Sequence, residues 1–482
     1  MTLRRKIQES RAELHLSGSR VSVLQQAAVR HHLTEEELAR MASVTVKQLL
    51  LFIGSGTMVV LAGCARGLVG GSAAGDIAAV NHVVFMLQEN RSFDTYFGQL
   101  NTYRQSQGLS PDVDGMPANA SNPADDGSMV SAFKLNTLCI ENLSPAWLES
   151  HGDYNRFNPT GPALMDGFVH TAQGIAKFEG LKDTAGKRAM GYYDASDLPY
   201  YYFMATAFAT SDRWFAPMPT NSPPNRIAAF AATTQGHAHE PTQELTAPTI
   251  FHRLSDAGIS WKIYYTSTLS GGAPADSLHN YWPTFANAHS ANIVPVSQYL
   301  TDVKNGTLPA VSFIEAGYFN GLDEHPGDGT NIQAGQQYVA SLMNALMTSP
   351  SWKDTVFFLS YDEGGGAYDH VVPMNAVQPD GIPPRDLTST DQPGDFTRTG
   401  FRLPLIVVSP FTRKGFVSHT PADYTAVLKF IETRWRVSPL TKRDAAQMDM
   451  TEFFNFSNPP WATPPNPPGA DVDNSRCYDG LP

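Results

Sequence analysis

The sequence predicts an α/β fold in which a mostly parallel central sheet is flanked by helices and interrupted by loop insertions. Short runs rich in apolar, β-branched or aromatic residues recur at 83–87, 261–265, 310–314, 355–359 and 403–408. Helical patterns separate several of these runs, notably at 333–348 and 424–436. Alternating strands and helices indicate βαβ units and hence a mostly parallel sheet. Segments 101–126 and 375–395 are rich in residues typical of turns, so we expect surface insertions there.

Length and charge narrow the class of protein. A chain of 482 residues suits one large α/β domain with insertions, or two domains. The net charge of -12 argues against general nucleic-acid binding, because no basic face offsets it. We expect residues 65–482 to form the catalytic domain, ending in a Pro-rich tail, after an N-terminal extension at 1–64.

The N-terminal extension resembles an export signal. Residues 49–62 form an apolar run of about 14 residues, which is short for a bilayer span and typical of a signal peptide. Lys47 precedes the run, and Ala62 and Gly63 lead into Cys64, as in a bacterial lipobox. The alternative is a buried helix that ends in Gly-Cys. We expect an exported protein, either secreted or a cell-envelope lipoprotein (periplasm or outer membrane) anchored to the membrane at Cys64.

Two cysteines remain after Cys64. These are Cys139 and Cys477, and an even number of cysteines in an oxidising compartment is consistent with a disulfide. Such a bond would tie the Pro-rich tail to the rest of the domain. Two unpaired thiols are the alternative, and the sequence leaves both open.

The first polar cluster follows the apolar run at 82–87. Glu89 and Asn90 place a carboxylate beside a carboxamide, both oxygen donors that suit a hard cation. Ligand sites of open α/β sheets are built at the carboxyl ends of strands. The alternative is a helix N-cap with a solvated first turn.

The second polar cluster follows the run at 355–359. Asp362 and Glu363 are adjacent carboxylates, and like charges repel unless a cation lies between them. The glycines at 364–366 allow close backbone approach or a positive φ. The alternative is a solvated acidic turn. Together the clusters supply four oxygen donors, which favour Ca, Mg or Mn as one divalent metal ion, with Zn possible.

Ser222 is the candidate nucleophile. Ser222 and Pro223 precede an apolar helical stretch, a pattern that also fits an N-cap without chemistry. A helix N-terminus favours anions, and a phosphate bound there would meet Asn225 and Arg226. A metal beside the hydroxyl would lower its pKa and favour an alkoxide nucleophile.

Several ordered motifs resemble the bacterial phosphoesterase family of phospholipases C and a periplasmic acid phosphatase, within the alkaline phosphatase superfamily. The matching segments, from about residue 82 to about 435, are ENRSFD at 89–94, MDGFV at 165–169, PNR at 224–226, DEHP at 323–326, SPSW at 349–352, YDEGGGAYDHVVP at 361–373, GFRLP at 400–404 and SP at 409–410. The resemblance implies an alkaline phosphatase-like fold.

The resemblance also implies roles for individual residues. The metal ligands of the family correspond to Glu89, Asn90, Asp362 and Glu363 of this sequence. The family nucleophile corresponds to Ser222 rather than to Ser92. His325 and His370 lie in matching motifs and would bind phosphate or donate protons.

His151 is a weaker third histidine for these roles, and a purely structural role is an equal alternative for it.

The sequence departs from the pattern of the family at two places. Residues 220–223 read TNSP where the family has Gly-Pro-Thr, and Tyr424 replaces a common His.

We therefore predict a metal-dependent phosphoric ester hydrolase, with a phospholipid or small phosphoester as its substrate. The leading hypothesis is a phospholipase C-type phosphodiesterase that acts through a Ser phosphoenzyme. The alternatives are an acid phosphatase that acts on phosphate monoesters and an inactive surface lipoprotein. The intact pairs Glu89-Asn90 and Asp362-Glu363 argue against the inactive lipoprotein, because a binding module has no reason to keep a charged oxygen cluster.

Overall fold

The structure, a computed structural model, describes residues 76–156, 158, 160–327 and 329–478. The predicted signal segment and Cys64 lie outside these residues. None of the helices within them has both the length and the apolar composition that a membrane crossing requires.

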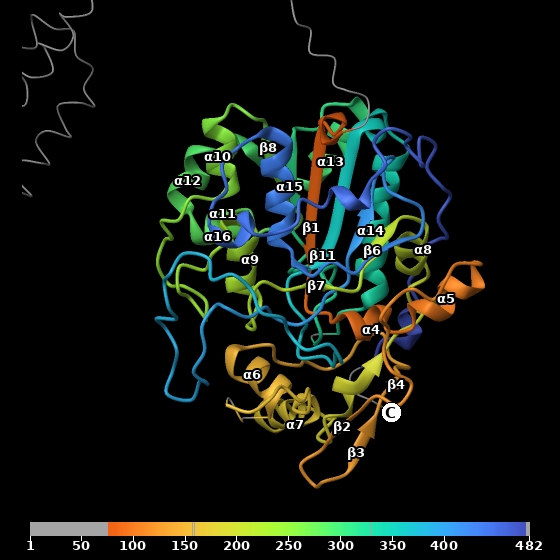
Figure 1. Ribbon diagram of the computed structural model, residues 1–482, viewed down its shortest axis with the longest axis vertical. Helices are drawn as coiled ribbons and strands as arrows, with labels where there is room; N and C mark the ends of the chain where they lie inside the picture. Colours follow the sequence, from red (N-terminus) through yellow and green to blue (C-terminus); the bar gives the residue numbers. More distant parts are fainter. Residues whose placement is uncertain (1–75, 157, 159, 328, 479–482) are drawn as a thin grey trace, which may run out of the picture. The chain divides into compact units, whose positions relative to one another are not determined.

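An eight-stranded sheet forms the centre of the described residues (Figure 1). Its strands, from one edge to the other, are β13 (Phe416–Ser418), β6 (Ala209–Ser211), β12 (Ile406–Val408), β11 (Thr355–Tyr361), β1 (His82–Gln88), β10 (Val311–Ile314), β8 (Trp261–Tyr265) and β9 (Ile293–Pro295). Strand β11 is buried along its whole length, as expected for a strand covered on both faces.

The prediction of a mostly parallel sheet is confirmed. Strand β1 pairs in parallel with β10 and β11, and β8 pairs in parallel with β10 and β9. Strand β12, from the predicted run at 403–408, instead runs antiparallel to both β11 and β6. This direction is allowed because the segment at 362–405 contains no crossover helix, which a parallel neighbour would need.

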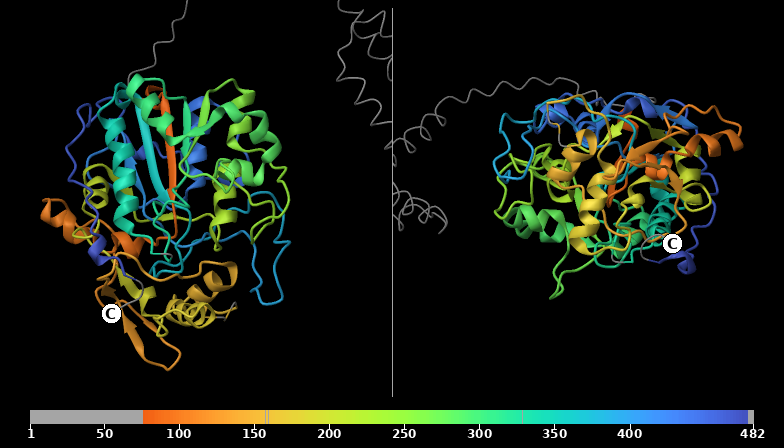
Figure 2. Two further views of the ribbon diagram at one scale, coloured as in Figure 1. Left: turned by 180° about the vertical axis from the view of Figure 1, so that it is seen from behind. Right: turned by 90° about the horizontal axis from the view of Figure 1, so that it is seen from below.

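Helices cover both faces of the sheet, as Figures 1 and 2 show. One layer contains α8 (Pro199–Ala207), α13 (Val296–Asn305) and α14 (Ile332–Met347), whereas the other contains α9 (Ser222–Ala231), α10 (Ile250–Asp256), α11 (Ser277–Tyr281), α12 (Pro283–Ala288), α15 (Thr425–Trp435) and α16 (Lys442–Ala445). Helices α14 and α15 confirm the helical patterns at 333–348 and 424–436 to within one residue at each end.

A smaller group of elements lies beyond the carboxyl end of β1, at the bottom of Figure 1. After α4 (Phe93–Phe97) and α5 (Leu100–Ser106) it contains β2 (Ser121–Pro123), β3 (Met129–Ser131), β4 (Phe133–Lys134), α6 (Trp147–Asn155), α7 (Phe168–Glu179) and β5 (Gly191–Tyr192). A further two-stranded pair joins β7 (Trp214–Phe215) to β14 (Ala422–Asp423). Short 3₁₀ helices complete the structure: η1 (Ile77–Ala79), η2 (Lys187–Met190), η3 (Ser290–Asn292), η4 (Pro350–Asp354), η5 (Thr451–Phe453) and η6 (Asn474–Arg476).

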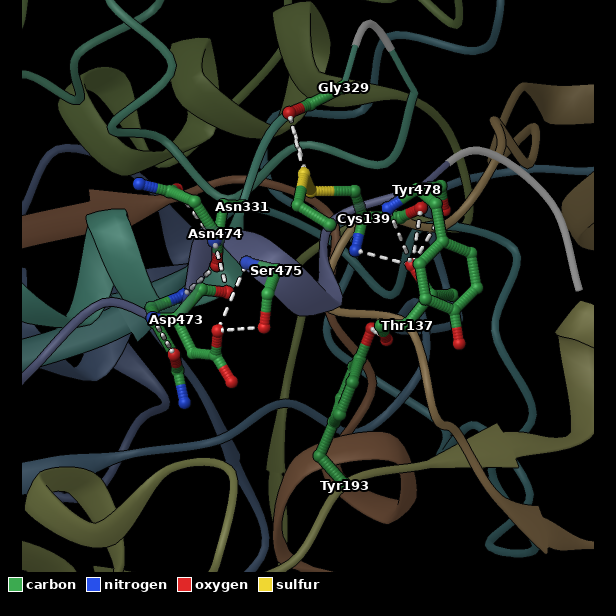
Figure 3. Close-up of a disulfide and its surroundings, with 11 residues drawn as sticks. Thr137, Cys139, Tyr193, Gly329, Asn331, Asp473, Asn474, Ser475 and Tyr478 are labelled. Carbon is green, nitrogen blue, oxygen red and sulfur yellow. Dashed lines mark hydrogen bonds between the residues drawn. A yellow bond between two sulfur atoms is a disulfide. The ribbon is translucent and has the colours of Figure 1, made fainter.

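Cys139 and Cys477 form a disulfide, which answers the question that the sequence left open (Figure 3). The bond joins the C-terminal segment to the chain before α6. Hydrogen bonds reinforce this junction: Thr137 Oγ1 donates to the carbonyl of Tyr478, and Asn331 Nδ2 donates to Asn474 Oδ1.

Candidate active site

The pairing of β1 with β11 brings the two predicted acidic clusters together. Gln88 and Tyr361, the last residues of the two strands, are partners in the parallel register. Glu89 and Asp362 therefore leave the sheet at the same level. The amide of Asp362 donates to the carbonyl of Gln88, and Asp362 Oδ1 accepts a hydrogen bond of 3.0 Å from the amide of Asn90.

Asn90 turns the chain sharply at the end of β1. Its φ is +59°, a left-handed conformation that Asn tolerates better than most residues. Gly365 packs against this turn, and a Cβ on Gly365 would lie 2.2 Å from the Asn90 carbonyl oxygen. The close approach, together with φ of +71° at Gly365, explains why the second cluster needs a glycine there.

Helix α9 places Ser222 against the first cluster. Asn221 is the N-cap of this helix, so the reading of Ser222 as a mere cap is wrong: Ser222 is the first helical residue. Its hydroxyl donates to Glu89 Oε2 at 3.1 Å and lies 3.2 Å from Asn90 Oδ1. The candidate nucleophile thus touches both oxygen donors that follow β1.

Arg226 lies one turn after Ser222 on α9 and is buried among carboxylates. Its Nη2 and Nε donate to Glu89 Oε1 at 2.6 and 3.0 Å, and Nε also donates to Asp362 Oδ2 at 3.1 Å. Its Nη1 has no hydrogen-bond partner. Arg226 lines the pocket described below, which keeps it a candidate for contact with an anion.

Asn225, the other predicted substrate contact, is fully occupied by the loop before α9. Its Oδ1 accepts from the amide of Met218, and its Nδ2 donates to the carbonyls of Met218, Thr220 and Asn221. The side chain is buried and does not line the pocket. Asn225 therefore stabilises the turn that carries Ser222.

The carboxylates at the two strand ends outnumber the cations beside them. Glu89, Asp362 and Glu363 are each at most 6 % exposed, and Arg226 is the guanidinium that bonds to this group. Burial and the charge of Glu89 raise the pKa of Asp362 to about 7. Burial and the charge of Asp362 raise the pKa of Glu363 well above its usual range.

This arrangement fits a bound cation. Glu363 Oε1 is buried without a hydrogen-bond partner, while Oε2 accepts from the amide of Gly365. An unpaired buried carboxylate oxygen is costly unless a cation meets it. Glu89, Asn90, Asp362 and Glu363 therefore form a donor set of carboxylate and carboxamide oxygens that suits a hard divalent metal.

A pocket of about 630 Å³ opens beside Ser222. The residues that line it include Glu89, Ser222, Arg226, Asp323 and His325. The Nδ1 of His325 lies 2.6 Å from the carbonyl oxygen of Pro326, which can only accept a hydrogen bond, so Nδ1 is the donor of this contact. This contact leaves Nε2 available for proton exchange.

The loop that carries His325 is anchored beneath the site by Glu324. This carboxylate is fully buried and accepts hydrogen bonds from the hydroxyls of Tyr96, Tyr201 and Tyr361 and from Gln88 Nε2. Arg91 Nη2 donates to the carbonyl of Glu324. Gly335 on α14 allows the fit, because a Cβ there would lie 2.2 Å from Glu324 Cγ. Arg91, which follows the metal-ligand candidates Glu89 and Asn90 in sequence, thus helps to position the loop that carries His325.

His370 belongs to a different buried cluster. Its Nδ1 lies 2.7 Å from Asp94 Oδ2, while Arg402 donates to Asp94 Oδ1 at 2.9 Å and to Asp369 Oδ2 at 3.2 Å. Burial alone would lower the pKa of His370, but the hydrogen bond and charge of Asp94 raise it overall. His370 does not line the pocket that contains Ser222.

Among the described residues, Asp94, Asp369 and His370 are the group of His, Cys, Asp or Glu side chains whose ligand atoms all lie within 4.8 Å of one another, close enough to hold a metal ion. Two of these residues already bond to the Arg402 guanidinium, so an ion there would have to displace or repel a buried cation. The Arg402 guanidinium therefore already balances part of the negative charge of this group.

His151 lies in a separate pocket, which it shares with Tyr154, Pro219 and Arg398. Its Nδ1 lies 2.7 Å from the carbonyl oxygen of Trp147, and burial lowers its pKa to about 4. The structure does not bring His151 to the pocket that contains Ser222. Tyr424, at the position where the family resemblance led us to expect a His, donates to the carbonyl of Asp362 at 3.1 Å.

Sequence reasoning missed Glu315, which lies at the end of β10. Its carboxylate is fully buried, lies 3.6 Å from Arg226 Nη1 and accepts a hydrogen bond from the hydroxyl of Tyr318. Tyr318 in turn lies under the Arg226 guanidinium, 4.9 Å from the ring centre. The signal was present, because Glu315 directly follows the predicted strand at 310–314, as Glu89 follows its own strand.

The chain is similar to known proteins of one enzyme family. The model of the Phosphoesterase family matches residues 80–438. Phospholipase C B of Mycobacterium tuberculosis is 29% identical over 451 residues, covering 84% of this chain and 82% of that protein. Non-specific phospholipase C1 of Arabidopsis thaliana is 28% identical over 407 residues, covering 79% of this chain and 72% of that protein.

Among solved structures, the chain is similar to a protein in the alkaline phosphatase superfamily from Vibrio parahaemolyticus, with a TM-score of 0.34 and 12% identity, over 73% of this chain and 78% of that one. The family match spans both strand-end clusters, Ser222 and His325. The chain therefore belongs to the phosphoesterase family and is a phosphoric ester hydrolase.

Proposed function

We propose that this protein is a metal-dependent phosphodiesterase of the phospholipase C type, with Ser222 as its nucleophile. The observation that carries the proposal is the contact of the Ser222 hydroxyl with Glu89 and Asn90, at a pocket lined by Ser222, Arg226 and His325. Nucleophile, anion contact and proton donor are thus available from one cavity.

In the proposed reaction Ser222 Oγ forms a bond to phosphorus, and the bond from phosphorus to the leaving alcohol breaks. The hydroxyl proton of Ser222 leaves toward Glu89 Oε2, its present hydrogen-bond acceptor. Water then attacks the phosphoserine ester: its oxygen bonds to phosphorus, its proton passes to His325 to replace the one given to the leaving alcohol, and the bond from phosphorus to Ser222 Oγ breaks. Ser222 Oγ takes back its own proton from Glu89, and the phosphate product leaves. Arg226 lines the pocket that holds the transferred group, and its Nη1, which lies 3.6 Å from Glu315 but has no hydrogen-bond partner, is available to donate to that group.

His325 is the residue that we assign to protonation of the leaving alcohol. It lines the pocket on the loop at 321–327, across from Ser222, and that loop is anchored by Glu324. A His whose Nδ1 faces a backbone carbonyl can exchange a proton through Nε2. The structure gives no comparable position to His151 or His370, so their assignment to the reaction stays a prediction.

Glu89, Asn90, Asp362 and Glu363 are the residues that would hold the divalent ion. When bound there, such an ion would lower the pKa of the adjacent Ser222 hydroxyl and offset negative charge on the phosphoryl oxygens. The all-oxygen donor set favours Ca, Mg or Mn over Zn.

A diester substrate is favoured by the size of the pocket and by the relatives. The cavity extends from Ser222 past Ser277, Asn280 and Tyr281, well beyond the volume that a single phosphate needs. The named relatives are phospholipases C. A monoester phosphatase is the alternative, and it predicts preference for a free phosphate monoester over a diester.

We also propose that the protein is exported, as a secreted protein or a lipoprotein anchored at Cys64. The disulfide between Cys139 and Cys477 supports an oxidising compartment, independently of the signal-like segment at 49–62.

One assay tests the proposed function. Purified protein is offered a chromogenic phosphocholine diester and a chromogenic phosphate monoester, with a chelator and then with Ca, Mg, Mn or Zn restored. We expect diester hydrolysis that the chelator abolishes and one of the metals restores. If neither ester is hydrolysed with any of the metals, the proposal is overturned. If the monoester is hydrolysed faster than the diester, the phosphatase alternative replaces the phosphodiesterase.

A further inference from the structure

Two exposed apolar side chains border the pocket that contains Ser222. Leu269 is 40% exposed and Phe319 is 66% exposed, and both line the pocket. They are the only two large hydrophobic side chains with this much exposure among the described residues that line it. Other exposed apolar residues of the described structure, such as Phe178 and Leu164, lie away from it.

The sheet explains why the loops that carry these two residues border the same pocket. Leu269 follows β8 and Phe319 follows β10, and these strands are parallel neighbours whose carboxyl ends share one edge. The two loops are joined by hydrogen bonds. Thr266 Oγ1 donates to the carbonyl of Glu315 at 2.8 Å, and the amide of Phe319 donates to Ser267 Oγ at 3.4 Å. We call Leu269 and Phe319, on these joined loops, the apolar rim.

The interior of the same pocket is polar. Its lining includes the buried side chains of Arg226, Asp323 and Ser277, together with His325. A ligand that fills the pocket therefore meets charged and hydrogen-bonding groups at its phosphate and apolar groups at the rim. A phospholipid has this distribution, because its head group and phosphate are polar and its diacylglycerol is not.

We propose that the apolar rim contacts the diacylglycerol part of a phospholipid, presented at a lipid surface. This inference rests on the proposed function and names the part of the substrate that the rim recognises. Leaving a Phe side chain two-thirds exposed forgoes burial that a lipid interface would supply. The head group would then point inward, and the released diacylglycerol would stay in the lipid surface.

The test compares a double variant, Leu269→Ser with Phe319→Ser, with a matched control, Phe178→Ser. Phe178 is 87% exposed in the last turn of α7 and does not line the pocket. All proteins are the full chain with Cys64→Ser, so that lipidation does not contribute. Turnover is measured on phosphatidylcholine vesicles and on a water-soluble chromogenic phosphocholine diester.

We expect the ratio of vesicle turnover to soluble turnover to fall roughly tenfold in the double variant, equivalent to about 1.4 kcal/mol, and to stay unchanged in Phe178→Ser. An unchanged ratio in the double variant, or an equal fall in Phe178→Ser, would overturn the inference. Circular dichroism and thermal unfolding check that the variants fold.

A binding measurement separates this inference from the proposed function. Sedimentation with phosphatidylcholine vesicles is carried out in the Ser222→Ala background, where the lipid is not consumed. Lower binding of the double variant alone supports the rim even if no substrate is hydrolysed. Equal binding of all three proteins contradicts the rim even if the wild-type chain is an active phospholipase.

Discussion

The hydroxyl oxygen of Ser222 lies 3.1 Å from Oε2 of Glu89, although 132 residues separate the two in the chain. Glu89 is placed by the end of β1, and Ser222 is placed by the first turn of α9. The contact joins the start of a helix to the carboxyl edge of the sheet. It makes the chemistry of Ser222 depend on the charge of the strand-end carboxylates.

Replacing Ser222 by Ala should lower the turnover of a phosphodiester by at least about 10³-fold, since no other hydroxyl touches Glu89 and Asn90 among the described residues. Ser92→Ala is the matched control. Ser92 caps α4 through the amide of Thr95 and donates to the carbonyl of Tyr368. This variant should lose about 1 kcal/mol of stability but keep most of its turnover. The opposite pattern in steady-state kinetics would show that the nucleophile is Ser92.

Divalent metal should stabilise the folded protein through Glu363. We expect thermal unfolding to shift upward with the metal that supports activity, by about 2.7 kcal/mol at a free concentration about 100 times the dissociation constant. Glu363→Gln should abolish the shift, because its buried Oε1 loses the charge that meets the ion. His370→Gln should keep the shift. If His370→Gln abolishes it and Glu363→Gln does not, the ion is bound by Asp94, Asp369 and His370 instead.

Acid should destabilise the protein through His151. Burial lowers the pKa of His151 to about 4, below its unfolded value of about 6.5, so the fold prefers the neutral ring. The stability that this preference contributes is complete above about pH 6.5. It is lost as pH falls toward 4, to a total of about 3 kcal/mol.

Denaturant unfolding of the wild-type chain and of His151→Gln at pH 7 and pH 4.5 measures this effect. The wild-type chain should lose more stability between the two pH values than the variant. Equal losses would mean that His151 does not titrate between them.

Loss of the disulfide should loosen the pocket wall as well as the C-terminus. The bond closes a separation of 338 residues, and the amide of Gly327 donates to the carbonyl of Ile140, next to Cys139. We expect Cys139→Ala with Cys477→Ala to cost about 2–5 kcal/mol in urea unfolding. Reducing agent should destabilise the wild-type chain and leave the double variant unchanged. A double variant as stable as the wild type would contradict this role.

The two strand-end clusters were predictable because their signal is local. A buried run followed at once by carboxylates identified Glu89 and Asp362, and the parallel register then determined that they meet. Helices α14 and α15 were predictable for the same reason, since each helical pattern lies in one continuous segment.

Other features depend on contacts between distant segments. The direction of β12 follows from its pairing with β6 and β11, which the run at 403–408 does not encode. Asn225 reads as an anion contact beside Arg226, but its partners are the carbonyls of the preceding turn. His151 was a weaker third candidate for the roles of His325 and His370, and the packing of α6 places it in another pocket.

Trapping the covalent intermediate tests the central claim most directly. The protein is mixed with a chromogenic phosphocholine diester and the metal that supports activity, quenched with acid during turnover, digested and analysed by mass spectrometry. The account predicts phosphocholine attached to the peptide that contains Ser222, and no adduct in Ser222→Ala. Turnover without any adduct on that peptide, or an adduct on another residue, would contradict the assignment of Ser222 as the nucleophile.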